Sequence, residues 1–251
     1  MPLEGQHPDT PKQSLAAWEL VCRPKGSGGL GVVDFQRKNA ALLIKFLVKF
    51  YNKVEVPWVH LVWSSYYVHK VPHADNLRGS FWWKDIMKLV DNFRAISFVG
   101  QGTGDSFMFW NDNWQIDNCI TTMKAKFPRL CSFAIDDELS AAAVYTRMDD
   151  LTTLFHLPLS RQALMELEAM KGWMLQNPLS LGHDVWSFCW GKNYTARQFY
   201  LQAFLYLTVP KTFSWIWVSR CTMNYKVFAW LLLRDRLNTK DMLKRRHWNV
   251  A

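Results

Sequence analysis

The sequence lacks the paired cysteines, the long apolar runs and the signal segment that define several common protein classes. Its five cysteines are far apart, their number is odd, and no CxxC pair occurs. We therefore expect neither a disulfide framework nor a self-contained zinc site. We expect a reducing, intracellular compartment. No stretch reaches the roughly 18 apolar residues of a membrane span, because Lys45 and Lys49 interrupt the run 42–50. The polar stretch 1–13 is unlike a signal peptide, so neither membrane insertion nor secretion is expected.

Tryptophan and positive charge are what the sequence has in excess. It contains 14 Trp in 251 residues, and 30 Lys and Arg against 21 Asp and Glu give a formal net charge of +9. A hydrophobic fraction of 49% is enough for a buried core, so a folded chain is expected. Many indole N–H groups must find partners or remain half exposed. The basic excess favours a polyanionic partner, and RNA or DNA is the partner we predict.

Periodicity predicts a mainly helical α+β protein. Helical spacing and capping residues favour helices over 35–52, 58–67, 80–90, 160–176, 195–206 and 225–233. The alternation over 184–190 predicts a strand with one aromatic face. The segments 95–99 and 106–110 flank a Gly-rich turn, which predicts a small antiparallel β-hairpin near 95–110. Asn238 can cap one more short helix.

Four lysines share one face of the first long helix, because they recur at helical spacing. They are Lys38, Lys45, Lys49 and Lys53. Such a stripe can contact phosphates, but a charged helix face is more often simply solvated. We favour the solvated face.

The stretch 26–31 matches the letters of the dinucleotide-binding pattern GxGxxG. That pattern works between a buried strand and a helix whose N-terminus faces the pyrophosphate. Pro24 disfavours a strand before the glycines, and about 20 positions on, where an acidic residue is required, the sequence has Tyr51 and Asn52. We interpret the stretch as a loop.

Catalytic and metal-binding constellations are not predicted either. His69 and His73 are four residues apart, but Pro72 between them disfavours a regular helix through both. The carboxylate pairs 136–137 and 149–150 have no hydrophobic frame of the kind that two-metal enzymes provide. No Ser or Cys lies in a nucleophile turn. We therefore expect no enzyme, no cofactor, no metal site and no small-molecule substrate.

The C-terminal stretch from Trp215 to Trp248 interleaves aromatic and basic residues, and only Asp235 and Asp241 oppose the positive charge. Aromatic rings stack on bases and cations neutralise phosphates, so this mixture suits single-stranded nucleic acid. The same rings could instead form a core, and we expect most of them to be buried and most basic side chains to lie outside. The predicted phosphate contacts are Lys226, Arg234, Arg236, Lys240, Lys244, Arg245 and Arg246.

An ordered series of short blocks carries more information than any one of these motifs. The blocks are 18–25, 28–32, 39–43, 79–86, 100–102, 109–114, 184–190, 194–196, 215–217, 226–230 and 236–243. In order and spacing they resemble the region downstream of the polymerase core in plant LINE-type (non-LTR) retrotransposon reverse transcriptases. The resemblance covers about residues 18–248.

The resemblance implies a flexible leader at 1–17, a connector after the polymerase core at 18–120 and a second connector at 121–210. Residues 211–251 then correspond to the N-terminal part of a reverse-transcriptase zinc-binding domain. In the family the catalytic aspartates lie upstream, and the zinc ligands follow the block that ends at Trp248, so neither is carried over. The implied protein is a truncated, non-catalytic fragment that binds RNA or DNA in the nucleus. The alternative is an interaction or scaffold module, or an unselected remnant that folds poorly.

Overall fold

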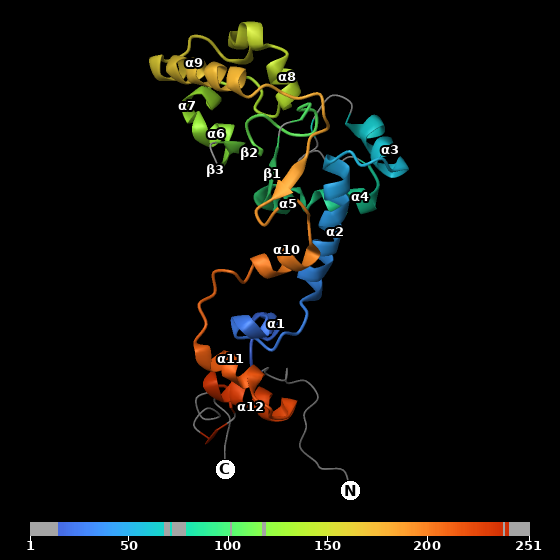
Figure 1. The fold of residues 1–251 in the computed structure, drawn as a ribbon, viewed down its shortest axis with the longest axis vertical. Helices are drawn as coiled ribbons and strands as arrows, with labels where there is room; N and C mark the ends of the chain where they lie inside the picture. Colours follow the sequence, from blue (N-terminus) through green and yellow to red (C-terminus); the bar gives the residue numbers. More distant parts are fainter. Residues whose placement is uncertain are drawn as a thin grey trace. The chain divides into compact units, whose positions relative to one another are not determined.

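The computed structural model describes residues 15–67, 71, 79–100, 102–116, 119–237 and 239–240. Helices dominate and one small sheet accompanies them, which confirms the mainly helical α+β fold (Figure 1). The chain forms two compact units. Unit 1 comprises Met1–Phe35 and Leu201–Ala251, and unit 2 comprises Gln36–Tyr200. The family-based boundaries after residues 17, 120 and 210 stay a prediction.

Unit 2 contains most of the regular elements. They are α2 (Phe35–Tyr51), α3 (Pro57–Tyr66), α4 (Phe81–Met87), α5 (Val90–Ile96), β1 (Ser97–Val99), β2 (Asn113–Ile116), β3 (Cys119–Thr122), α6 (Met123–Lys126), α7 (Pro128–Cys131), α8 (Ala141–Tyr145), η2 (Met148–Leu154), α9 (Arg161–Gln176), β4 (Trp186–Phe188) and the start of α10 (Ala196–Gln202). Local sequence explains several helix starts. The hydroxyls of Ser80, Ser140 and Ser160 each accept a hydrogen bond from the backbone N–H three residues on, which satisfies a donor that the helix leaves free.

Most of the predicted helices are present, with ends that shift by a few residues. The range 80–90 is the main difference, because it breaks after Met87 and a new helix, α5, starts at Val90. The strand predicted at 184–190 is confirmed over its centre as β4. Asn238 lies outside the residues that the structure describes.

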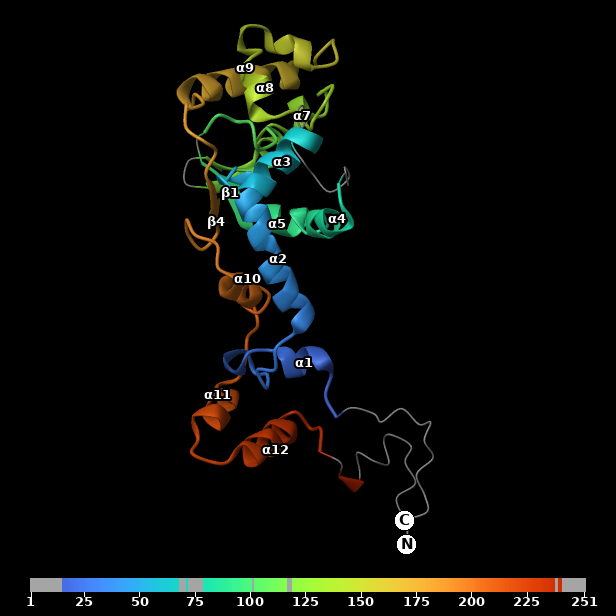
Figure 2. The same cartoon turned by 90° about the vertical axis from the view of Figure 1, so that its right-hand side faces the viewer.

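The sheet has the order β3-β2-β1-β4. β1 pairs in parallel with β2, with Val99 opposite Trp114, and antiparallel with β4, which comes from far along the chain. Figure 2 shows β1 and β4 side by side. The antiparallel hairpin is β2 with β3, where Asn113 lies opposite Thr122.

The hairpin predicted near 95–110 is therefore wrong. β1 confirms its first arm in part, but 106–110 contributes only an isolated bridge from Met108 to Ser140. Side chains explain the difference. The carboxylate of Asp184 accepts hydrogen bonds from the N–H groups of Gly104 and Ser106, and Asp112 accepts one from Met108. These carboxylates bind the backbone donors that a hairpin ladder would have used.

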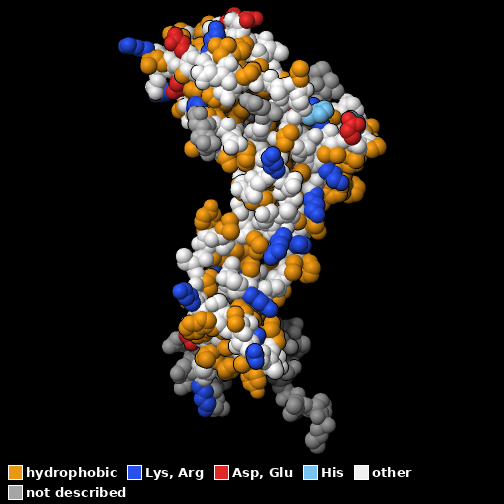
Figure 3. Space-filling model, in the orientation of Figure 1, with side chains coloured by type: hydrophobic (Ala, Val, Ile, Leu, Met, Phe, Trp, Pro, Cys, Tyr) orange, Lys and Arg blue, Asp and Glu red, His pale blue; other side chains and the backbone are white. Residues whose placement is uncertain are grey.

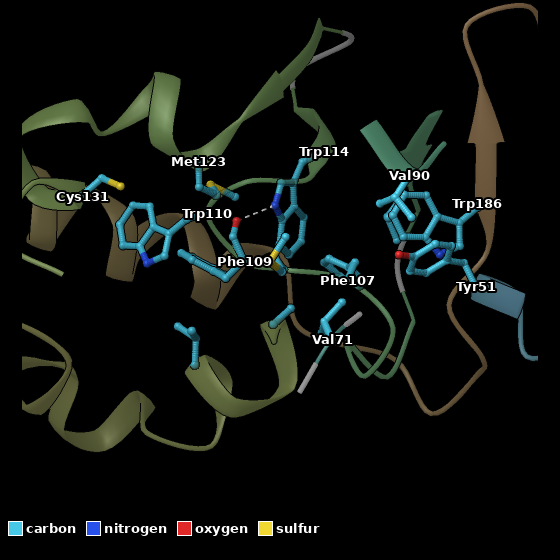
Figure 4. Packing of buried hydrophobic residues seen from close by; sticks show 14 of the residues in the cluster. Tyr51, Val71, Val90, Phe107, Phe109, Trp110, Trp114, Met123, Cys131 and Trp186 are labelled. Carbon is cyan, nitrogen blue, oxygen red and sulfur yellow. Dashed lines mark hydrogen bonds between the residues drawn. The ribbon is translucent and has the colours of Figure 1, made fainter. Parts of the chain in front are cut away.

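Aromatic rings fill the core of unit 2. Tyr51 stacks on Phe93 with ring centroids 5.0 Å apart and 9° between the planes, and Trp186 packs against both rings. Figure 4 shows Trp186 and Tyr51 together. In the same view, the indole N–H of Trp114 donates to the carbonyl oxygen of Phe109 at 2.9 Å. Burial raises the pKa of the Tyr51 hydroxyl well above its ordinary value, so this ring is a neutral core residue.

Unit 1 is built from α1 (Trp18–Cys22), η1 (Lys25–Ser27), α11 (Lys211–Val218) and α12 (Met223–Leu233). Its centre is the glycine-containing stretch 26–31. The fully buried Trp230 donates its indole N–H to the carbonyl oxygen of Gly28 at 2.8 Å. Gly28 has a φ of 75°, which glycine adopts without strain. The glycine pattern at 26–31 thus anchors α12 to the N-terminal segment, and the predicted loop is confirmed except for the short 3-10 turn η1 over Lys25–Ser27.

Replacement of Gly29 by alanine should destabilise unit 1 by about 1–3 kcal/mol, the usual cost of overpacking a tight site. A Cβ atom at Gly29 would lie 2.0 Å from the backbone oxygen of Arg23, a clash that only a backbone shift can relieve. A Cβ at Gly26 meets nothing within 4 Å, so Gly26→Ala is the matched control. Hydrogen exchange of peptides from 15–35 and 211–237 measures the effect. Equal protection in the two variants would contradict it.

Candidate nucleic-acid interface

Helices α11 and α12 combine exposed rings with exposed cations. Trp215, Tyr225 and Phe228 are 67%, 68% and 54% exposed. The cations Lys211 and Arg220 are exposed in the same segment. The expectation that most of these aromatics are buried is therefore wrong for these three, because the described residues of unit 1 leave them largely uncovered.

The seven predicted phosphate contacts fall into three groups. Arg236 and Lys240 are exposed and can reach an external partner. Lys226 and Arg234 are half-buried and bind backbone carbonyls inside unit 1. Lys244, Arg245 and Arg246 lie outside the described residues. As phosphate contacts, all seven stay a prediction.

Arg234 has a clear role within unit 1. Its Nη2 donates to the carbonyl oxygen of Gly28 at 2.7 Å, and its guanidinium carbon lies 4.8 Å from the ring centre of Phe213 and 5.1 Å from that of Trp230. Burial lowers the pKa of this guanidinium, and the positive charges of Arg23 and Arg236 lower it further. Lys226 is held similarly, since its Nζ donates to the carbonyl oxygen of Trp217 at 3.0 Å.

Lys38, Lys45 and Lys49 are all exposed on α2, and the choice between a solvated face and a phosphate-binding face stays a prediction. Figure 3 shows basic side chains following α2 on the face in view. Lys53 differs, because it is half-buried and its Nζ lies 4.8 Å from the centre of the Trp63 ring. The helical spacing placed Lys53 with the others, but it lies beyond the end of α2, so its side chain does not follow that face.

Two buried aspartates in unit 2 were missed as key residues by sequence reasoning. Asp184 is 5% exposed and accepts three hydrogen bonds, from the N–H of Gly104, the N–H of Ser106 and the hydroxyl of Ser106, at 2.7, 2.8 and 2.8 Å. Asp112 is 1% exposed and forms an ion pair with Arg94, 3.0 Å between Oδ1 and Nε. Burial by itself would lower the pKa of Arg94, but the Asp112 carboxylate raises it above its ordinary value. Both aspartates lie in blocks of the family resemblance, which was the available signal.

The other acidic candidates form local contacts of their own. In the pair 136–137, the first carboxylate accepts from the N–H of Glu138 and the second lies 3.5 Å from the Nζ of Lys124. In the pair 149–150, Asp150 accepts from the N–H of Thr152. His69 and His73 lie outside the described ranges. Over the part of the chain with described coordinates, no three His, Cys, Asp or Glu side chains gather as metal ligands.

The cysteines are free thiols, two of them buried and three exposed. Burial raises the pKa of the Cys131 thiol, which keeps it protonated and unreactive. None of the helices in the described ranges combines the length and the hydropathy that a bilayer crossing requires.

Sequence comparison finds a family model and a known protein that are similar to this chain. A family model described as zinc-binding in reverse transcriptase matches residues 194–251. The chain is also 24% identical over 267 residues to an Arabidopsis thaliana protein named "Putative ribonuclease H protein". That match covers 99% of this chain and 41% of the relative, so the chain spans less than half of the relative's length. No solved structure matches. Together the two matches support a retrotransposon-related protein.

The matched segment does not supply a zinc site by itself. Residues 194–251 contain one cysteine, Cys221, and one histidine, His247. A structural zinc site is held by four ligands drawn mainly from Cys and His. The exposed Cys221 is not part of any ligand group among the residues that the structure describes.

Proposed function

We propose that this chain is a non-catalytic segment of a LINE-type retrotransposon reverse transcriptase that binds single-stranded RNA or DNA through α11 and α12. One observation carries the proposal. Exposed rings and exposed cations occur together on the two helices that fall in the segment matched by the reverse-transcriptase family model. Rings stack on bases without sequence preference, and cations neutralise phosphates.

Arg236 and Lys240 should be the phosphate contacts whose loss weakens binding without unfolding unit 1, because both are exposed. For single strands, the slope of log K against log salt falls by about 0.7 for each phosphate contact removed. The double variant Arg236→Ala/Lys240→Ala should therefore have a slope shallower by about 1.4. Fluorescence anisotropy with a labelled oligonucleotide, over a salt series, measures it.

Arg161→Ala/Lys171→Ala is the charge-matched control, because Arg161 and Lys171 are both exposed on α9 in unit 2. Its slope should equal that of the unmodified chain. A chain that binds neither RNA nor DNA at low ionic strength would refute the proposal. Polymerase or ribonuclease H activity of the purified chain would refute its non-catalytic part. A nuclear location belongs to the same proposal, and imaging of a tagged chain tests it.

An interaction module is the second candidate, and the apolar surface of unit 1 favours it. Val218 is 82% exposed, Leu232 is 56% exposed and Leu233 is 48% exposed, in addition to the rings of α11 and α12. Contiguous exposed apolar surface commonly marks a protein interface or a surface that another part of the protein covers. Concentration-dependent association that high salt does not reverse would support this function over nucleic-acid binding.

A further inference from the structure

The exposed side of α2 carries a straight row of positive charge. Lys38, Lys45 and Lys49 are exposed, and their intervals of seven and four residues place them on one side of the helix. The row is about 16 Å long, at a rise of about 1.5 Å per residue. Phosphates follow each other every few ångströms along a nucleic-acid strand, so the row is long enough to meet several of them.

The charge of this row is not balanced along the helix. The sequence of α2 contains basic residues but no Asp or Glu. Lys45 and Lys49 form an i, i+4 pair of like charge, which destabilises a helix. The exposed side of α9 differs, because it carries Glu168 three residues before Lys171. A solvated helix face commonly mixes the two signs in this way, whereas an unbalanced row is stabilised by an anionic partner.

Aromatic side chains of α4 border the row. Phe46 lies one turn before Lys49 on α2, and the ring of Trp82 meets the ring of Phe46 edge to face with centroids 5.1 Å apart. The ring of Phe81, the residue before Trp82, is 83% exposed, which leaves its faces open to a base. Asp85, the acidic residue of α4, is occupied by an ion pair with the lysine three residues on. An uncovered ring beside a row of cations is the combination that binds single-stranded nucleic acid.

We propose that the α2–α4 surface, formed by Lys38, Lys45, Lys49 and Phe81, binds a single strand of nucleic acid, with phosphates along the lysine row and a base against the Phe81 ring. The spacing of the lysines alone favours a solvated face, but the unbalanced charge and the uncovered ring favour a bound strand. The surface lies in unit 2. It rests on the proposed function for the class of partner and adds a second site, distant in the sequence from α11 and α12.

The triple variant Lys38→Ala/Lys45→Ala/Lys49→Ala tests the lysine row. Fluorescence anisotropy with a labelled single-stranded oligonucleotide should give a slope of log K against log salt that is shallower by about 2, since each lost phosphate contact removes about 0.7. The variant should melt at the same temperature or higher, because alanine favours a helix and the repulsion between Lys45 and Lys49 is gone. Weaker binding therefore reports the lost contacts and not a lost fold.

Arg129→Ala/Arg161→Ala/Lys171→Ala is the charge-matched control, because these three residues are exposed on α7 and α9 in unit 2. It should keep the slope of the unmodified chain. A lysine-row variant with that same unchanged slope would overturn the proposal. Binding to anionic lipid vesicles that depends on the row, without such binding to the oligonucleotide, would also overturn it, because the partner would then be a membrane surface.

Phe81→Ala tests the base contact. Loss of one stacked base should weaken single-strand binding by about fivefold or more at an unchanged salt slope. Binding of a duplex should stay unchanged, because paired bases are not free to stack on the ring. Equal effects on the single strand and the duplex would overturn the preference for a single strand.

The two proposed surfaces can fail separately. Arg236→Ala/Lys240→Ala and the lysine-row variant should each lower the salt slope, and their effects should add when the five substitutions are combined. A slope that falls only for the row variant would leave the α2–α4 surface without the α11–α12 interface. A slope that falls only for Arg236→Ala/Lys240→Ala would retain that interface and overturn the α2–α4 surface.

Discussion

Replacement of Asp184 by alanine should lower the free energy of unfolding of unit 2 by about 3–5 kcal/mol, because each of several buried donors is left without an acceptor. Those donors are the N–H of Gly104 and the N–H and hydroxyl of Ser106. The loss also reaches the sheet, since the same hydroxyl accepts the indole N–H of Trp186 at 3.2 Å. Urea titration measures the total effect, and hydrogen exchange of peptides from 102–112 localises it.

Two variants sharpen this result. Asp184→Asn keeps one carbonyl oxygen but turns an N–H group toward donors, so it should be destabilising by about 1–3 kcal/mol. Asp105→Ala removes an exposed carboxylate from the same loop and should change stability by no more than about 0.5 kcal/mol. If Asp184→Ala were as stable as Asp105→Ala, the loop would not depend on the buried carboxylate.

Breaking the ion pair between Arg94 and Asp112 should lower the free energy of unfolding of unit 2 about as much as Asp184→Ala does. The pair is almost fully buried, with side chains 12% and 1% exposed, so removal of one partner leaves the other charge without compensation. Arg94→Met and Asp112→Asn should each lower the free energy of unfolding by about 3–5 kcal/mol. The Asn113 side-chain amide donates to the backbone carbonyl oxygens of Arg94 and Ser97, and both variants keep these hydrogen bonds.

The double variant Arg94→Met/Asp112→Asn is the decisive measurement. It should be clearly more stable than the sum of the single effects predicts, with a coupling energy of about 1–3 kcal/mol, because it leaves no isolated charge. The surface pair Lys88–Asp85, with side chains 64% and 61% exposed, is the control and should show coupling below about 1 kcal/mol. Additive effects at Arg94 and Asp112 would show that the two side chains act separately.

Both predictions concern residues that the sequence presents as parts of separate blocks. The fold joins these blocks. Asp184 and Trp186 form hydrogen bonds with Ser106 in the loop after β1, and Asp112 forms an ion pair with Arg94 of α5. These contacts give both aspartates a structural role in unit 2. The proposed function rests on the basic C-terminal segment.

The sequence by itself determined the elements and the chemical character of this protein. Helical periodicity predicted α2, α3, α9 and α12 closely, and Ser160 caps α9, because such signals act over one or two turns and do not depend on distant residues. The scattered cysteines, which predicted a reducing compartment, and the basic C-terminal segment, which predicted a nucleic-acid partner, were likewise read directly from the sequence.

The tertiary structure alone decided the pairings and which side chains are free. β1 pairs with β2 and β4 rather than with 106–110, because two buried carboxylates, the distant Asp184 and the nearby Asp112, bind the backbone of that segment. The same holds for the cations. Lys226 and Arg234 bind carbonyl oxygens within unit 1, whereas Arg236 stays exposed, although all three look alike in the sequence. A hydrogen bond across 206 positions, from Arg234 to Gly28, leaves no periodic signal, so only the folded chain reveals it.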